Sequence, residues 1–177
     1  AEILDKGICY SAGTEFSSAT KISSGRGLAA FTCTVDGLDP NKTYYVCAYA
    51  ENSAGISYGE QMSFTTETAL AELSVTVVTD VTSSTAALRS SVLDEGGENP
   101  YEVGFYYSES ENAEAAFSQK VICMLNDDSF CAVISGLTRS TRYYVRPYAV
   151  NSAGETVGET VVFTTLAEMP AVETAEV

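Results

Sequence analysis

One long phrase occurs twice in this chain, and that repeat restricts the folds open to it more than any other feature of the sequence. The segment from Leu38 to Thr66 returns without a gap, 99 positions later, as Leu137 to Thr165. Both copies consist of strand-forming residues interrupted by turn-forming ones, and neither shows a helical period. A repeat of this length and spacing predicts tandem copies of one β module, each of ordinary β-sandwich size. We therefore expect an all-β chain built of antiparallel sheets.

Apolar and polar residues alternate along the centre of each copy, as they do in half-buried strands. The face assigned to the core carries Tyr44, Val46, Ala48 and Ala50 in the first copy, and Tyr143, Val145, Pro147 and Ala149 in the second. Proline donates no hydrogen bond to a neighbouring strand, so we expect an irregular sheet at Pro147. Each strand leads into a turn that ends at Gly55 or Gly154, because Asn and Gly tolerate left-handed backbone. The strands after these turns end at Phe64 and Phe163.

The sequence upstream of the repeat extends the alignment of the two copies. Alternating apolar residues predict a strand over 31–35 in the first copy and over 130–134 in the second. Further back, Gly7–Ser11 corresponds to Gly104–Ser108 at an offset of 97. Both of these segments are expected to be strands of the same sheet as the repeated block.

Two strands at the start of the second copy, roughly 73–79 and 85–92, have no counterpart in the first copy. We therefore divide the chain into a first module at 1–66 that lacks its first two strands, a linker at 67–72, a complete second module at 73–166, and a tail at 167–177 that resembles the first strand of a third module. A module without two strands would leave one sheet face and one edge uncovered. Either residues ahead of Ala1 in a longer chain supply these strands, which we favour, or another chain does.

A set of residues in the first copy has the spacing of a fibronectin type III domain, and the repeat resembles that family. The set is Leu38, Pro40, Tyr44, Val46, Ala48, Ala50, Asn52, Gly55 and Thr65–Thr66, and the second copy keeps it with Arg139 in place of the proline. The variant resembles modules repeated in bacterial surface and secreted proteins. The resemblance implies tandem immunoglobulin-like sandwiches in which Tyr44 and Tyr143 are corner tyrosines that bond backbone a few residues upstream.

Composition argues against catalysis and against binding to polyanions. The chain has no His, which removes the commonest general base and metal ligand, and its net charge of −15 disfavours nucleic acids and anionic membranes. Ser18 to Lys21 matches Ser-X-X-Lys but lies in a serine-rich loop. The acidic turns at 94–98 and 126–128 lack the ligand count of a calcium loop. We expect no enzyme, no cofactor and no metal.

The five cysteines are an odd number, so at least one is a free thiol or pairs outside the chain. Cys9 and Cys47 point outward on neighbouring strands, where a cross-strand disulfide is geometrically allowed. Cys123 and Cys131 flank the turn at 126–128 symmetrically, where they could face each other across a hairpin. Cys33 lies between apolar residues and is expected to be a buried hydrophobe. For both pairs we favour free thiols over disulfides.

The sharpest candidate for binding is a set of outward-facing side chains on the second copy, namely Tyr106, Tyr144, Arg146 and Tyr148. Tyrosines beside a guanidinium can form a flat platform for a sugar ring or a protein hot spot. The alternative, which we favour, is that they are cross-strand pairs on a solvated sheet face.

These features predict a non-enzymatic spacer or adhesion module at the cell surface or outside the cell, with a protein or carbohydrate ligand and no nucleic acid or membrane insertion. One alternative makes the chain an accessory module of a secreted polysaccharide-degrading enzyme. Another makes it an assembly protein that self-associates by strand exchange through its incomplete first module.

Overall fold

The computed structural model describes residues 2–110 and 119–168, so most of the tail predicted at 167–177 lies outside the described part. The chain divides into two compact units, residues 1–68 and residues 69–177. Apart from one turn of 3₁₀ helix, η1 (Phe16–Ser18), every regular element in the described residues is a β-strand. The all-β prediction is confirmed. No helix in this part of the chain is long and apolar enough to cross a membrane.

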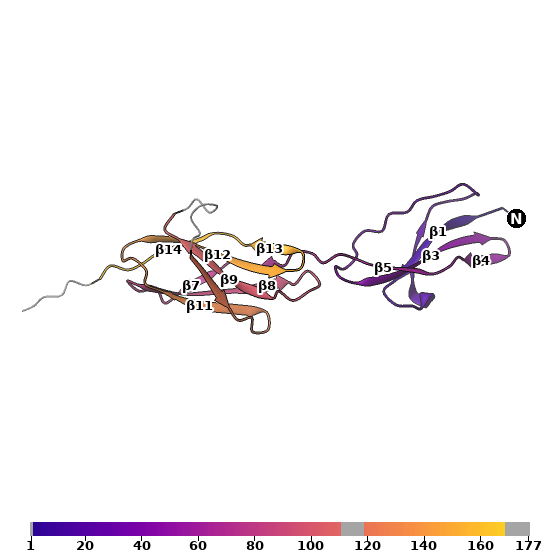
Figure 1. The fold of residues 1–177 in the computed structure, drawn as a ribbon. Helices are drawn as coiled ribbons and strands as arrows, with labels where there is room; N and C mark the ends of the chain where they lie inside the picture. Colours follow the sequence, from indigo (N-terminus) through magenta and orange to yellow (C-terminus); the bar gives the residue numbers. More distant parts are fainter. Residues whose placement is uncertain (1, 111–118, 169–177) are drawn as a thin grey trace, which may run out of the picture. The chain divides into compact units, whose positions relative to one another are not determined.

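The first unit contains one antiparallel sheet in its described residues (Figure 1). Its strands are β1 (Asp5–Ser11), β2 (Thr20–Ser23), β3 (Thr43–Asn52), β4 (Gly55–Tyr58) and β5 (Met62–Thr65). Their order is β2-β1-β3-β4, and β5 pairs with the first half of β3.

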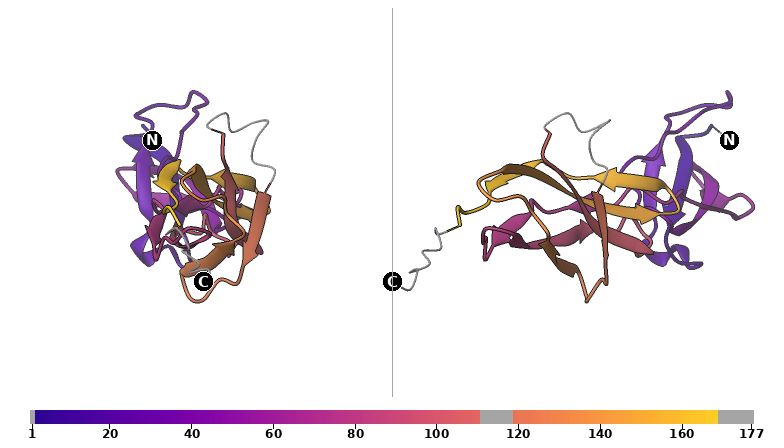
Figure 2. Two further views of the ribbon diagram at one scale, coloured as in Figure 1. Left: turned by 90° about the vertical axis from the view of Figure 1, so that its left-hand side faces the viewer. Right: turned by 60° about the vertical axis from the view of Figure 1, so that its left-hand side comes forward.

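The second unit has two antiparallel sheets that face each other, and both layers are visible in Figures 1 and 2. The sheet in the order β10-β9-β12-β13, with β14 paired to β12, repeats the sheet of the first unit. It consists of β9 (Glu102–Ser108), β10 (Gln119–Cys123), β12 (Arg142–Asn151), β13 (Gly154–Val157) and β14 (Val161–Thr164). The other, in the order β11-β8-β6 with β7 paired to β8, consists of β6 (Glu72–Leu73), β7 (Val77–Thr79), β8 (Thr85–Asp94) and β11 (Ser129–Ser135). Leu88 and Phe130 from this sheet meet Phe105 and Val145 from the first in one buried core.

The strand expected over 31–35 does not form, although its counterpart β11 does. β11 pairs along its whole length with β8, and the described residues of the first unit include no strand equivalent to β8. Phe31 is 36% exposed, whereas the equivalent Phe130 is 1% exposed. The prediction was wrong because alternation makes a strand only where a neighbour offers backbone partners.

The boundary between the units, after residue 68, falls inside the segment predicted as a linker. Ala71 is buried in the second unit's core and Glu72 begins β6, so the end of that segment belongs to the second unit. Asn151 holds the start of the second unit in place, because its Nδ2 donates to the carbonyl oxygens of Ala69 at 2.8 Å and Glu95 at 3.1 Å.

We expect Asn151→Ala to destabilise the second unit by about 1–3 kcal/mol, because the carbonyl oxygens of Ala69 and Glu95 lose the buried side-chain donor that joins them. The equivalent Asn52 makes the local bond from Ala54 N to its Oδ1, at 2.8 Å, and Asn52→Ala should cost the first unit less. Hydrogen-exchange mass spectrometry of both variants, which reads each unit separately, checks this difference. Equal losses in the two units would contradict it.

The tyrosines implied as corner residues make the expected hydrogen bonds. Thr138 N donates to Tyr143 Oη at 2.8 Å, and Asp39 N donates to Tyr44 Oη at 3.0 Å. Each ring is buried and stacks on a phenylalanine, Tyr143 on Phe163 with centroids 5.6 Å apart and Tyr44 on Phe64 with centroids 6.0 Å apart. The turn glycines Gly55 and Gly154 have φ of +134° and +135°, a region that L side chains rarely adopt.

The sheet is irregular at Pro147, as expected. β12 pairs with β14 as far as Val145 and with β13 from Tyr148 onward, and Gly158 N donates to Pro147 O at 2.8 Å between the two ladders. The first unit has the same interruption at Ala48, whose carbonyl accepts from Gly59 N at 2.8 Å. The irregularity therefore belongs to the repeat and does not depend on proline.

Candidate functional site

The aromatic set predicted on the outer face of β12 is not an open platform. Tyr148 is 0% exposed. Lys120, from β10, places its Nζ 4.4 Å from the centre of the Tyr148 ring, and the Tyr106 ring packs beside it with centroids 4.6 Å apart. The prediction that Tyr148 faces solvent was wrong, because its neighbours on the same sheet cover it.

The other predicted members are held by contacts within the unit. Tyr106 Oη donates to Glu155 Oε1 at 2.6 Å, and Arg146 Nε donates to Thr160 Oγ1 at 2.5 Å. Tyr144 is half-buried. The four side chains thus come from one face of the sheet, but they interlock with it and leave no flat aromatic surface.

Lys120, which the sequence analysis did not single out, organises this face. Its Nζ lies 2.6 Å from Glu102 Oε1 and 5.5 Å from the centre of the Tyr106 ring. The hydrogen bond to Glu102 raises the pKa of Lys120, and the same bond lowers the pKa of Glu102. Burial, followed by the Glu102 carboxylate, raises the pKa of Tyr148 to about 12.

The first unit carries an equivalent cluster. Lys21 Nζ lies 5.1 Å from the ring centre of the buried Tyr49, whose Oη donates to Asp5 Oδ2 at 2.8 Å. Burial, followed by the bond to Asp5, raises the pKa of Tyr49 to about 12. Lys21 and Lys120 are 99 positions apart, so the repeat itself contained the signal for this cluster. Its presence in both copies supports a packing role for these aromatic residues.

We expect the Glu102–Lys120 pair to make stability depend on pH at both ends of the range. The pKa of Glu102 is lowered, so its contribution is complete above about pH 4.3, the ordinary value, and is lost as pH falls through the folded-state pKa. The pKa of Lys120 is raised, so its contribution is complete below about pH 10.4 and is lost as pH rises through the folded-state pKa.

Urea unfolding of wild type and Glu102→Gln between about pH 2 and pH 7 tests the acid side. The gap between the two midpoints should be widest near neutral pH and should close at the acid end. Glu159→Gln, at an exposed acidic residue of the same unit, is the matched control. A gap that stays constant with pH would refute the prediction.

The opposite face of the first unit's sheet is apolar and only partly covered, with Tyr44 and Lys6 buried on it. In the second unit, Phe105, Phe130, Val145 and Ala149 are all at most 1% exposed. Their counterparts in the repeat are Ile8, Phe31, Val46 and Ala50, of which Phe31 is exposed and the others are half-buried. The same positions that form a core in one unit thus meet solvent in the other.

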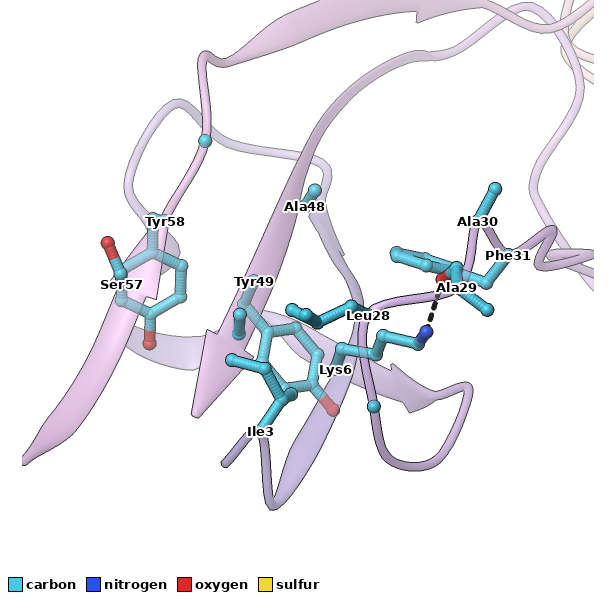
Figure 3. A pocket seen from close by; sticks show the side chains of 13 residues that line it. Ile3, Lys6, Leu28, Ala29, Ala30, Phe31, Ala48, Tyr49, Ser57 and Tyr58 are labelled. Atoms are coloured by element: carbon cyan, nitrogen blue, oxygen red, sulfur yellow. Dashed lines mark hydrogen bonds between the residues drawn. The ribbon is translucent and has the colours of Figure 1, made fainter. Parts of the chain in front are cut away.

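A hollow of about 640 Å³ lies along this face, between the sheet and the stretch 27–31 (Figure 3). Leu28 lines it and is 91% exposed. Figure 3 shows Lys6 reaching across to donate to the carbonyl oxygen of Ala29, and its Nζ lies 5.5 Å from the centre of the Phe31 ring. The equivalent of Lys6 in the second unit is Val103, a core residue. The face is therefore apolar with one cation on it.

The cysteines occupy four different settings. Cys9 and Cys47, expected to point outward, are buried because Phe16 and Ala19 pack over them, and they face each other across β1 and β3 with Sγ atoms 2.8 Å apart. Cys33, expected to be buried, is half-buried because the strand around it does not form. Cys123 lies on β10 and Cys131 on β11, which belong to different sheets, and the turn between them closes with reciprocal backbone hydrogen bonds between Asn126 and Ser129. Burial, followed by Cys131, raises the pKa of Cys123 to about 11.

The described residues contain no group of three or more His, Cys, Asp or Glu side chains placed to hold a metal ion. Three contributors to the surfaces escaped the sequence analysis: Lys6, Lys120 and Phe16, which packs over the cysteine pair. The repeat contains a signal for the two lysines only. Lys120 aligns with Lys21 of the first copy, and Lys6 is a charged residue at the position where the second copy has the core residue Val103.

No protein-family model and no curated protein matches this chain. Among solved structures, the FN1–FN3 domains of chicken CNTN1 are 19% identical with a TM-score of 0.43, over 92% of this chain and 56% of that one, so this chain spans little more than half of its length. A sensor domain of the anti-sigma factor RsgI4 from Pseudobacteroides cellulosolvens is 18% identical with a TM-score of 0.44, over 55% of this chain and 96% of that one. A fibronectin type III domain of human KIAA0970 is 17% identical with a TM-score of 0.40, over 58% of this chain and 78% of that one.

At these identities and TM-scores nothing about function follows from the likeness. The strand order of the second unit, with two antiparallel sheets around one core, is itself that of an immunoglobulin-like sandwich, as expected. The first unit contains, in its described residues, one of the two sheets of that sandwich.

Proposed function

We propose that this chain is a non-enzymatic module of a bacterial surface or secreted protein, and that its first unit binds polypeptide by accepting two β-strands on its open face. One observation carries the proposal: residues that are core in the second unit have counterparts in the first that are solvent-exposed or half-buried. An exposed apolar surface of this kind marks an interaction site. The placement outside the cell rests on the family resemblance of the repeat.

The second unit supplies the chemistry of the partner. There β8 presents Ala86, Leu88 and Val92 to the core, two or four residues apart, and pairs with β11 along its edge. A partner for the first unit needs the same alternation of apolar residues and an edge that can pair with residues 31–35. This is β-strand addition, in which backbone hydrogen bonds give affinity and alternate side chains give specificity.

We favour residues ahead of Ala1 in a longer chain as the source of these strands, with a different protein as the alternative, and charge disfavours a second copy of this chain. Each copy carries a net charge of −15, so two copies repel each other. Lys6, on the same face, is 7% exposed and its Nζ already donates to the carbonyl oxygen of Ala29. A sugar ligand on Tyr106, Tyr144, Arg146 and Tyr148 gains no support, because Tyr148 is covered by its neighbours.

The repeat provides a matched probe. A second copy of residues 69–97, joined directly ahead of Ala1, places β6 to β8 in register with the first unit, because the offset between the copies there is 97. We expect this fusion to stabilise the first unit by about 2 kcal/mol or more, since each large apolar side chain that it buries contributes about 1.5–3 kcal/mol before ordering costs. Hydrogen exchange of β1 and β3 peptides measures the gain.

The control fusion carries aspartate at the fused copies of Leu88 and Val92, which point into the core. It should give no gain. Equal protection by both fusions, or by neither, would overturn the proposal. Analytical ultracentrifugation of the unmodified chain tests whether a second copy occupies the face instead. A concentration-dependent dimer that is weakened by Phe31→Asp would assign the face to a second copy.

A further inference from the structure

Cys9 and Cys47 lie opposite each other near the centre of the β1–β3 ladder, on the sheet face away from the open apolar one. They are direct register partners, and their Sγ atoms are 2.8 Å apart. Residues in such a position have Cβ atoms about 4.5–5.5 Å apart, and a disulfide joins Cβ atoms about 3.5–4.5 Å apart. A small approach of the two side chains is sufficient to form the bond.

The pair is shielded once the unit has folded. Cys9 is 1% exposed and Cys47 is 5% exposed, and Phe16 and Ala19 pack against them. Burial, followed by the contact with Cys9, raises the pKa of Cys47 to about 11. A thiol reacts as its thiolate, so the folded pair reacts slowly with solvent reagents, and the time for oxidation is during folding, before Phe16 covers the sulfurs.

The repeat does not require cysteine at either position. The equivalent residues in the second unit are Tyr106 and Arg146, which are also direct register partners. That unit is held together by two sheets around one core, whereas the described residues of the first unit form one sheet. The first unit alone therefore has a pair of side chains able to join its two central strands covalently.

We propose that Cys9 and Cys47 are a disulfide site, oxidised during folding in a compartment that contains small-molecule disulfides. One thiolate attacks the small disulfide RS–SR, forming a mixed disulfide and releasing one RSH after protonation. The second thiolate attacks the protein sulfur of that intermediate, forming the Cys9–Cys47 bond and releasing the second RSH. Two protein thiols are oxidised and one small disulfide is reduced to two thiols.

Trypsin separates the relevant cysteines, because cleavage after Lys6, Lys21, Arg26, Lys42 and Arg89 puts Cys9 in peptide 7–21, Cys33 in 27–42 and Cys47 in 43–89. We expect the full chain, refolded with oxidised glutathione, to yield 7–21 linked to 43–89, and dithiothreitol to separate them. Closing a loop between residues 38 positions apart should lower the unfolding equilibrium constant of the first unit by roughly 700-fold.

Two variants complete the test. Cys33→Ser is expected to keep the link, and Cys47→Ser is expected to abolish it. The peptide map of the wild-type chain remains a valid test even if a variant misfolds. Oxidation in denaturant is the second control: it should give mixed cysteine pairings, which would show that the fold directs the Cys9–Cys47 bond. Recovery of 7–21 and 43–89 as free thiols after oxidative refolding, or a link from 7–21 to 27–42, would overturn the proposal.

Discussion

Phe130→Ala is expected to destabilise the second unit by about 3–5 kcal/mol, whereas Phe31→Ala should cost the first unit about 0.5 kcal/mol. The two residues occupy the same position of the repeat. Phe130 is 1% exposed and packs against Phe105 with ring centroids 5.1 Å apart, so its removal leaves a cavity in a two-sheet core. Phe31 is 36% exposed and belongs to no strand, so its removal leaves no enclosed space.

Hydrogen exchange followed at increasing urea concentration gives the two losses separately, because peptides of β8 and β12 report the second unit and peptides of β1 and β3 report the first. Thr32→Ala, beside Phe31 and also exposed, is a control for general disturbance of that segment. A loss from Phe31→Ala close to that from Phe130→Ala would mean that the face of the first unit is covered in solution, contrary to the structure.

Gly104→Ala is expected to cost the second unit about 3 kcal/mol or more, at the upper end for an added methyl group. A Cβ at this position would lie 2.0 Å from Val121 O and 2.8 Å from the ring of Tyr148. The backbone of β9 or β10 has to shift to relieve the first contact, and the second displaces a ring held under Lys120. The ladder between β9 and β10 is therefore expected to weaken along with the tyrosine cluster.

The thermal midpoint of the second unit and the near-ultraviolet circular dichroism of its tyrosines both report this change. Gly59→Ala is the mild counterpart, because a Cβ there meets only ordinary contacts at 3.7 Å from Ala48. Gly7→Ala should repeat the large effect in the first unit, where a Cβ would lie 1.9 Å from Ile22 O. If Gly104→Ala is as mild as Gly59→Ala, the close packing of Tyr148 over Gly104 is wrong.

The features that the sequence predicted well are those that short segments determine by themselves. The repeat predicted two copies of one sheet, and both sheets have the same strand order. The turns at Gly55 and Gly154 follow from residues next to each other in the chain, and the structure gives both glycines positive φ. The alternation in β12 predicted correctly that Tyr143 and Val145 enter the core.

The misplaced features depend on neighbours that are distant in sequence. Alternation puts Tyr148 on the outer face of the sheet, but it carries no information that Lys120 will cover it. Residues 31–35 have the pattern of a strand, yet strand formation needs a partner with the pairing that β8 gives to β11. In each case a segment distant in sequence, by covering a side chain or by pairing with a strand, determines the structure of the residue.

The central claim, that the first unit has an uncovered sheet face able to receive two strands, is tested most directly by a tryptophan placed on that face. The chain has no Trp, so the variant Phe31→Trp contains a single indole reporter. We predict that its fluorescence is that of a water-exposed indole, readily quenched by acrylamide, and that the fused copy of residues 69–97 shifts it to the blue and protects it. Blue, protected emission without the fusion, or exposed emission with it, would contradict the claim.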